Sequence, residues 1–193
     1  VRCQLGKMTT MEYINDSDFK VHGAGLKFND EPAEWYPEDE IEDVFASIDW
    51  DRTRLLCHNT AFDGAVLAAK YGHHPRYYLD TSAMARGLYP GQSSSLANVA
   101  IRLWPDDESM RKGDDLIKSK GLHDLPPDVE EALASYCIQD TELTYAIFKQ
   151  WEMEIPSSEY DLIDITTRMF TRPRLIIDRE RLTTYMEQER VNA

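Results

Sequence analysis

The segment DVEEALASYCIQDTELTYAIFKQW, from Asp128 to Trp151, decides how the rest of this 193-residue chain is interpreted. Its apolar side chains recur every three or four residues, a spacing that places them on one face of an α-helix. They are Val129, Leu133, Tyr136, Cys137, Leu143, Ile147, Phe148 and Trp151. Pro126 and Pro127 stand at the start, where a missing backbone N–H costs little. We therefore predict a long helix with its apolar face against a core.

One position on this predicted helix does not suit a purely packing role. Asp140 lies one turn after Tyr136, so a carboxylate and a phenol share the face that carries Leu133 and Phe148. A carboxylate that is shielded from water needs a partner for its charge, and a metal ion is one such partner. Tyr136 and Asp140 are therefore our first candidate functional residues.

The length and composition of the chain restrict the classes of protein to which it can belong. A chain of 193 residues can hold one domain with its own core. The formal net charge of −14 argues against a stand-alone nucleic-acid binder, because affinity for phosphates comes largely from Lys and Arg. The same acidity is compatible with an enzyme whose carboxylates hold Mg²⁺. No run of eighteen apolar residues occurs, so we expect a soluble protein without a membrane partner.

Three cysteines, Cys3, Cys57 and Cys137, lie far apart in the sequence. An odd number at irregular spacing is typical of free thiols in a reducing compartment and not of a disulfide or zinc framework. We therefore expect free cysteines and a cytoplasmic protein.

Periodicity along the chain predicts the order of the other elements. Strands are expected at residues 19–28, 34–36, 54–57 and 77–79. Helices are expected from Pro37 to about Ile48, after Asn59 up to Gly72, and at 82–89, 93–104 and 160–170. Residues 9–16 are expected to form a loop or a short helix, and residues 105–121 a flexible loop with a short helix around Leu116. This order indicates an α/β domain with a mixed sheet covered by helices. We place a domain at 1–155 and a helical connector at 156–193.

A second candidate feature lies where the predicted strand 54–57 leads into a helix. There the sequence reads HNTAFD, with Asn59, Phe62 and Asp63 at the strand end where α/β proteins place their chemistry. Each feature is weak alone, because an Asp at a helix start is often a cap, and a Tyr four residues before an Asp is often a structural pair.

Taken together and in this order, the two features resemble the second and third motifs of the DnaQ-like 3′–5′ exonucleases. That family, also called DEDD for its four acidic residues, has the pattern Asp-x-Glu, then Asn-x-x-Phe/Tyr-Asp, then Tyr-x-x-x-Asp in its tyrosine-bearing subclass. This chain has HNTAFD and YCIQD, and Ser135 stands where the histidine-bearing subclass has its His. Three further segments resemble the proofreading domain of phage-type family A DNA polymerases: KMTTMEYINDSDFKVHGAG, YLDTSAMARGL and DITTRMFTRPRLIIDRERL.

The resemblance implies an RNase H-like fold, a mixed sheet flanked by helices, and two-metal hydrolysis of a single-stranded DNA 3′ end. It implies Asp63 and Asp140 as catalytic ligands of two Mg²⁺ or Mn²⁺ ions. It implies Tyr136 as a third catalytic residue that orients the attacking water, because a phenol with an ordinary pKa of about 10 is a poor base at neutral pH. Asn59 and Phe62 would bind the terminal nucleotide, with a base stacked on Phe62. A polymerase domain in cis and a bacterial host or phage-infected cell are also implied.

The sequence departs from the family pattern at the first motif. No Asp-x-Glu precedes HNTAFD. Matches elsewhere come after the second motif, such as Asp106 to Glu108, which follows a proline in a predicted loop. The chain begins with Val1 and its last residues continue a helical pattern, so we expect a piece of a longer chain whose first strand lies upstream. With half of the metal site absent, we expect the 193 residues alone to bind metal weakly and to have weak or no nuclease activity.

Two other functions fit the same residues. The first is a non-catalytic module with an exonuclease fold that positions DNA, which a complete parent chain without acids on its first strand would favour. The second is an RNA-trimming exonuclease of the same subclass, which RNA degradation without a downstream polymerase domain would favour. A plain α/β domain without an active site is the simplest alternative.

Overall fold

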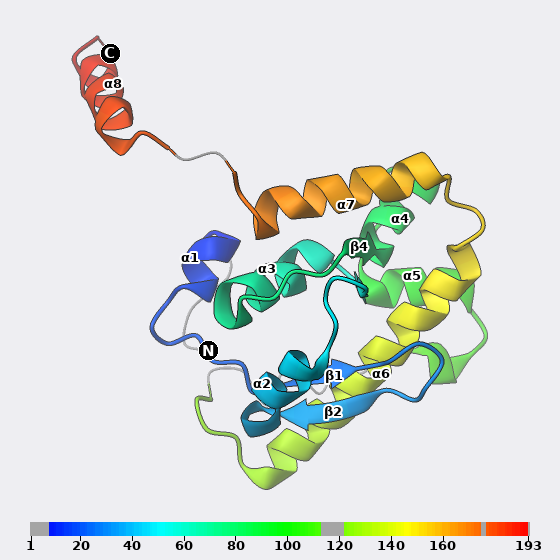
Figure 1. Ribbon diagram of the computed structural model, residues 1–193. Helices are drawn as coiled ribbons and strands as arrows, with labels where there is room; N and C mark the ends of the chain where they lie inside the picture. Colours follow the sequence, from blue (N-terminus) through cyan, green and yellow to red (C-terminus); the bar gives the residue numbers. More distant parts are fainter. Residues whose placement is uncertain (1–7, 113–121, 175–176, 193) are drawn as a thin grey trace.

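The computed structural model describes residues 8–112, 122–174 and 177–192 (Figure 1). The predicted helix around Leu116 lies outside these ranges. Four short strands occur as two pairs. β1 (Gly23–Leu26) and β2 (Glu34–Pro37) are antiparallel, whereas β3 (Arg54–Cys57) and β4 (Tyr77–Asp80) are parallel.

The structure combines helices with antiparallel and parallel strands, which confirms the predicted α/β class. The helices are α1 (Thr10–Ile14), α2 (Glu38–Ser47), α3 (Thr60–Tyr71), α4 (Thr81–Leu88), α5 (Leu96–Leu103), α6 (Pro127–Trp151), α7 (Ser157–Thr171) and α8 (Arg179–Asn192), with a 3₁₀ turn at Glu108–Met110. The predicted helix 93–104 begins at Leu96, because the Ser95 hydroxyl accepts a hydrogen bond from the backbone N–H of Asn98 and caps it there. None of the described helices combines the length and apolarity that a bilayer crossing requires.

The strands form two separate sheets over the described ranges, where the sequence predicted one mixed sheet. The reason is that β1 pairs only with β2 and β3 pairs only with β4, so no strand joins the two pairs. Both sheets nevertheless contact α6. At Gly25 of β1 the helix comes so close that a Cβ would lie 2.9 Å from the carbonyl oxygen of Cys137.

The faces of the two sheets that point away from α6 are covered by the same two helices, α2 and α3. A buried cluster of Ile41, Phe45 and Leu67 from α2 and α3 packs against Leu26 of β1 and Leu55 of β3. The two sheets therefore lie between the same layers, with α6 on one side and α2 and α3 on the other.

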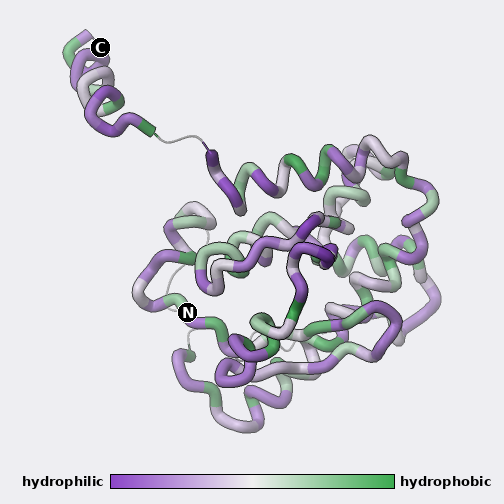
Figure 2. Tube along the Cα trace, viewed as in Figure 1, coloured by the Kyte–Doolittle hydropathy of each residue, from purple (hydrophilic) through white to green (hydrophobic). Residues whose placement is uncertain are grey.

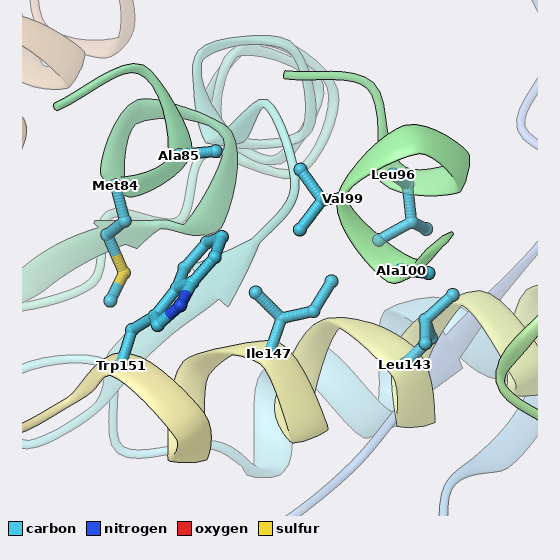
Figure 3. Packing of buried hydrophobic residues seen from close by; sticks show 8 residues of the cluster. All are labelled: Met84, Ala85, Leu96, Val99, Ala100, Leu143, Ile147 and Trp151. Atoms are coloured by element: carbon cyan, nitrogen blue, oxygen red, sulfur yellow. The ribbon is translucent and has the colours of Figure 1, made fainter. Parts of the chain in front are cut away.

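The largest core cluster lies between α4, α5 and α6 (Figure 3). Its buried members are Met84, Ala85, Leu96, Val99, Ala100, Leu143, Ile147 and Trp151. Trp151, at the end of α6, is only 1% exposed. The prediction that α6 turns its apolar stripe inward is thus confirmed for Leu143, Ile147 and Trp151, and Leu133 and Tyr136 are buried as well.

The segment after Pro156 begins with a helix that packs on the preceding fold. α7 runs along α3 and β4, and the Asp164 carboxylate accepts a hydrogen bond of 2.8 Å from the backbone N–H of Tyr78 (Figure 1). α8 stands apart from this body in Figure 1, is largely hydrophilic in Figure 2, and buries no side chain. The domain boundary near Pro156 stays a prediction.

Candidate active site

The turn between β3 and α3 fixes the position of Asp63. Asn59 has a left-handed backbone conformation, with φ 79° and ψ 53°, which asparagine adopts more readily than most residues. The next residue, Thr60, is fully buried and donates a hydrogen bond of 2.5 Å to the carbonyl oxygen of Leu79 in β4. This hydrogen bond connects β4 to the start of α3. Asp63 lies in the first turn of α3.

A second carboxylate, Asp80, holds this turn in place from the end of β4. It is 5% exposed and accepts backbone N–H bonds from Asn59 (3.0 Å), Thr60 (3.2 Å), Ser82 (2.8 Å) and Ala83 (3.2 Å). Asp80 therefore joins the starts of α3 and α4. Asp80 was not among the residues predicted to have a function, although an Asp directly before a predicted helix is the pattern of an N-cap.

The Asp63 carboxylate combines contact with solvent and a crowded protein surrounding. Its residue is exposed, yet desolvation by the neighbouring protein, with a smaller effect of the Asp80 charge, raises its pKa to about 7. Its own backbone N–H opposes the rise. Water on the exposed side of the carboxylate weakens this desolvation, so only the upward direction of the pKa shift bears on function. A cation beside Asp63 would relieve this cost.

On α6, Asp140 and Tyr136 share one cationic partner, Lys112. The Lys112 ammonium lies 2.5 Å from Asp140 Oδ2 and 4.8 Å from the centre of the Tyr136 ring. Burial acts to lower the pKa of Lys112, but its hydrogen bonds with Asp140 and Tyr136 outweigh that effect and the pKa is raised. Burial also raises the pKa of the Tyr136 phenol, so this group keeps its proton at neutral pH.

The second oxygen of Asp140 is left without a partner. Oδ1 is buried and accepts no hydrogen bond from the residues that the structure describes, although a carboxylate oxygen in such a place nearly always has a partner. A hard divalent cation binds oxygen ligands, and this unpaired carboxylate oxygen is a ligand of that type. Among the residues that the structure describes, however, no three Asp, Glu, His or Cys side chains form a group that could hold a metal.

The charges of Asp63 and Asp140 both raise the pKa of one thiol, that of Cys137. Burial, the charge of Asp140 and the charge of Asp63 raise the pKa of Cys137 to about 12, against the effect of Lys112. No hydrogen bond or ion pair links the two carboxylates within residues 8–112 and 122–174. The charges of both carboxylates therefore reach Cys137, but the described residues form no group that could hold a metal.

The two predicted nucleotide-binding residues lie on either side of the α3 start. Asn59 is exposed, and its backbone N–H donates a hydrogen bond to the Asp80 carboxylate. Phe62 is half-buried against the cluster of Tyr13, and the two ring centroids are 6.2 Å apart. One side of Phe62 is thus occupied by protein, and its role toward a base stays a prediction.

The cysteine prediction is confirmed where the structure describes it. Cys57 and Cys137 are free thiols, and Cys3 lies outside the described ranges. Burial raises the pKa of both thiols, which keeps them protonated and unreactive.

The site therefore consists of a solvent-exposed carboxylate on α3 and a Tyr–Asp pair on α6, with a lysine as the present counter-ion. Hard oxygen ligands beside a phenol can bind cations and position a water molecule. Comparisons with models of protein families, with curated proteins and with solved structures found no significant match.

Proposed function

We propose that this chain is the 3′–5′ exonuclease module of a phage-type family A DNA polymerase, which removes nucleotides from a single-stranded DNA 3′ end. The observation that carries the proposal is Asp140, whose buried Oδ1 has no partner one helical turn from Tyr136. A satisfied structural carboxylate has no such spare acceptor. The exposed Asp63, with its raised pKa, supplies a second carboxylate that a cation would stabilise.

The chain's own residues have separate roles in this proposal. Asp63 and Asp140 would hold two Mg²⁺ or Mn²⁺ ions, which supply charge stabilisation at the scissile phosphate when bound. Tyr136 remains protonated, because burial raises its pKa, and so it orients water through its hydroxyl instead of removing a proton. Asn59 and the open side of Phe62 would contact the terminal nucleotide.

The arrangement of the strands supports the finer part of the fold proposal, an RNase H-like mixed sheet. β1 and β3 each have one paired edge, and both lie between α6 and the α2–α3 layer. The residues of β1 and residues 55–57 of β3 are only half-buried and Arg54 is exposed, although β4, the neighbour of β3, is nearly fully buried at Tyr78 and Leu79. One strand between β1 and β3 would join the two sheets, and we propose that it carries the missing Asp-x-Glu.

Two experiments test the proposal. The gene sequence upstream of the Val1 codon should encode a short apolar strand that ends in Asp-x-Glu. In the complete protein, Asp140→Ala should abolish degradation of a 3′-labelled single strand and spare polymerisation, because only the exonuclease uses this carboxylate. Retained nuclease activity in that variant contradicts the proposal.

The same experiments address the alternatives. A complete protein whose corresponding strand lacks acidic residues would be a DNA-positioning module with Asp63 and Asp140 as relics. Degradation of RNA but not DNA, without polymerase activity, would indicate the RNA-trimming function.

A further inference from the structure

The large apolar side chains of α7 are mostly exposed, whereas its buried side chains are polar. Where α7 packs on α3 and β4, the side chains that it buries are Asp164, Thr167 and Thr171. Tyr160 and Ile163 add half-buried contacts to the core of α4, α5 and α6. The exposed apolar side chains are Leu162, Ile165, Met169 and Phe170. Since a surface helix normally turns its apolar face inward, the outward face of α7 has the composition of a contact surface.

Three of these exposed side chains form one stripe along the helix. Leu162, Ile165 and Met169 are spaced by three and four residues, so they share one face, and they are 57%, 55% and 68% exposed. We call them the α7 stripe. Other exposed apolar side chains, such as Met11 on α1 and Ile101 on α5, stand singly on their helices. Single apolar side chains are ordinary on a protein surface, whereas a contiguous stripe marks an interaction site, and α7 lies along the outside of the body in Figure 1.

The charges beside the α7 stripe are separated along the helix. Glu159 and Asp161 lie at its N-terminal end, and Arg172 lies directly after its last turn. Within the described residues, neither Glu159 nor Arg172 forms an ion pair. Asp161 accepts a hydrogen bond of 2.7 Å from the Tyr77 hydroxyl, which supplies no positive charge. The stripe thus has an acidic end and a basic end, both available to a partner.

This separation of charge favours an antiparallel pair of two α7 helices. In that orientation the acidic end of each helix lies beside the basic end of the other, so the attraction between opposite charges occurs twice. A parallel pair would set like charges against each other. The apolar side chains fit the same orientation, because Ile165 lies near the middle of the stripe and Leu162 of each copy then faces Met169 of the other.

α8 is the other candidate cover for the α7 stripe, because it also exposes apolar side chains and follows α7 in the chain. Its first residues, Arg179, Glu180 and Arg181, alternate in charge. If α8 folded back along α7, its start would offer both signs of charge to Arg172, whereas a second α7 offers acidic side chains. A second copy of α7 therefore matches the stripe better than α8 does.

We propose that the α7 stripe is the interface of a twofold symmetric dimer of this chain, in which the two α7 helices pack antiparallel. A twofold dimer uses the same patch on both subunits, and the α7 stripe is complementary to itself in apolar contacts and in charge. The dimer does not depend on the proposed function, because no residue assigned to the candidate active site belongs to α7.

Sedimentation equilibrium of the 193-residue chain tests the proposal. The wild type should change from the mass of one chain to the mass of two as its concentration rises. Ile165→Asp places a charge in the middle of the apolar interface on both subunits and should weaken the dimer at least about tenfold. Ile101→Asp is the matched control, because it makes the same change at a side chain that is 47% exposed on α5, and it should match the wild type.

An exchange of charges tests the antiparallel orientation. Arg172→Glu sets like charges against Asp161 of the other copy at both ends, and should weaken the dimer roughly tenfold. Adding Asp161→Lys to the same chain restores opposite charges and should recover most of the affinity. Circular dichroism checks that each variant is folded, and the charge exchange decides the question even if Ile165→Asp does not fold.

Three outcomes overturn the inference. The first is a wild type that keeps the mass of one chain up to about 1 mM, where any remaining association is negligible. The second is an Ile165→Asp variant that dimerises as tightly as Ile101→Asp, which would place the interface on another face. The third is a double variant that dimerises no more tightly than Arg172→Glu, which would exclude the antiparallel pairing of α7.

Discussion

Asp80 and Asp140 are both withdrawn from bulk water, but the protein satisfies them in different ways. Asp80 accepts four backbone N–H bonds from two strand-to-helix turns, all of them fixed parts of the fold. Among the described residues, Asp140 has a flexible lysine on Oδ2 and a hydrogen bond with Tyr136, and its Oδ1 accepts no hydrogen bond. The first arrangement leaves no capacity for a ligand, whereas the second leaves an acceptor and a replaceable partner. The comparison indicates which carboxylate maintains the structure and which one is available for chemistry.

The largest effect should come from breaking the satisfied carboxylate. Asp80→Asn would keep a carbonyl oxygen for the three N–H groups that bond to Oδ1, but it would remove the negative charge and set an amide N–H against the buried backbone N–H of Thr60. We expect the free energy of unfolding to fall by about 3 kcal/mol or more, since bonds to charged acceptors are strong and buried unpaired donors are costly. Urea denaturation followed by circular dichroism measures this loss.

Asp140→Asn is the matched substitution at the half-satisfied carboxylate. It should lower the free energy of unfolding by only about 1 kcal/mol, because the partly exposed Lys112 can turn its ammonium into water. The same denaturation measurement applies. Equal losses for the Asp80 and Asp140 variants would remove the distinction between the two carboxylates.

Asp63 extends the comparison to a carboxylate that forms no ion pair with a side chain in the described part of the chain. Its pKa is raised to about 7 in the folded protein, mainly by desolvation, against about 3.9 in the unfolded chain. Between these values the folded state holds a proton that the unfolded state releases, so stability should fall as pH rises from about 4 to about 7. Asp63→Asn should flatten that part of the curve of unfolding free energy against pH, and an unchanged slope would contradict the assignment.

The smallest effect is expected at Tyr136. Tyr136→Phe keeps the ring under Lys112 and removes only the hydroxyl, so the free energy of unfolding should change by less than about 1 kcal/mol. In the complete protein, the same change should slow DNA degradation by roughly ten- to a hundredfold, because a positioned hydroxyl is lost. An unaltered degradation rate would show that the hydroxyl does not orient the attacking water.

Local pattern accounts for the parts of the fold that the sequence predicted well. The strand at 54–57 agrees with β3 residue for residue, and the helix predicted from Asp128 to Trp151 agrees with α6 within one residue. Both depend on side-chain periodicity and on turn residues close in sequence, such as Gly72 at the end of α3. The division of the described strands into two sheets was not predictable in this way, because strand pairing depends on segments that are distant in the sequence.

The sequence by itself determined the element order, the inward face of α6 and the identity of the candidate carboxylates. Only the tertiary structure decided how each carboxylate is satisfied. Lys112 reaches Asp140 across 28 residues from a segment without periodicity, and Asp80 gathers N–H groups from a turn some twenty residues away. Periodicity reports the face of one element, whereas the partner of a buried charge is set by which elements pack together.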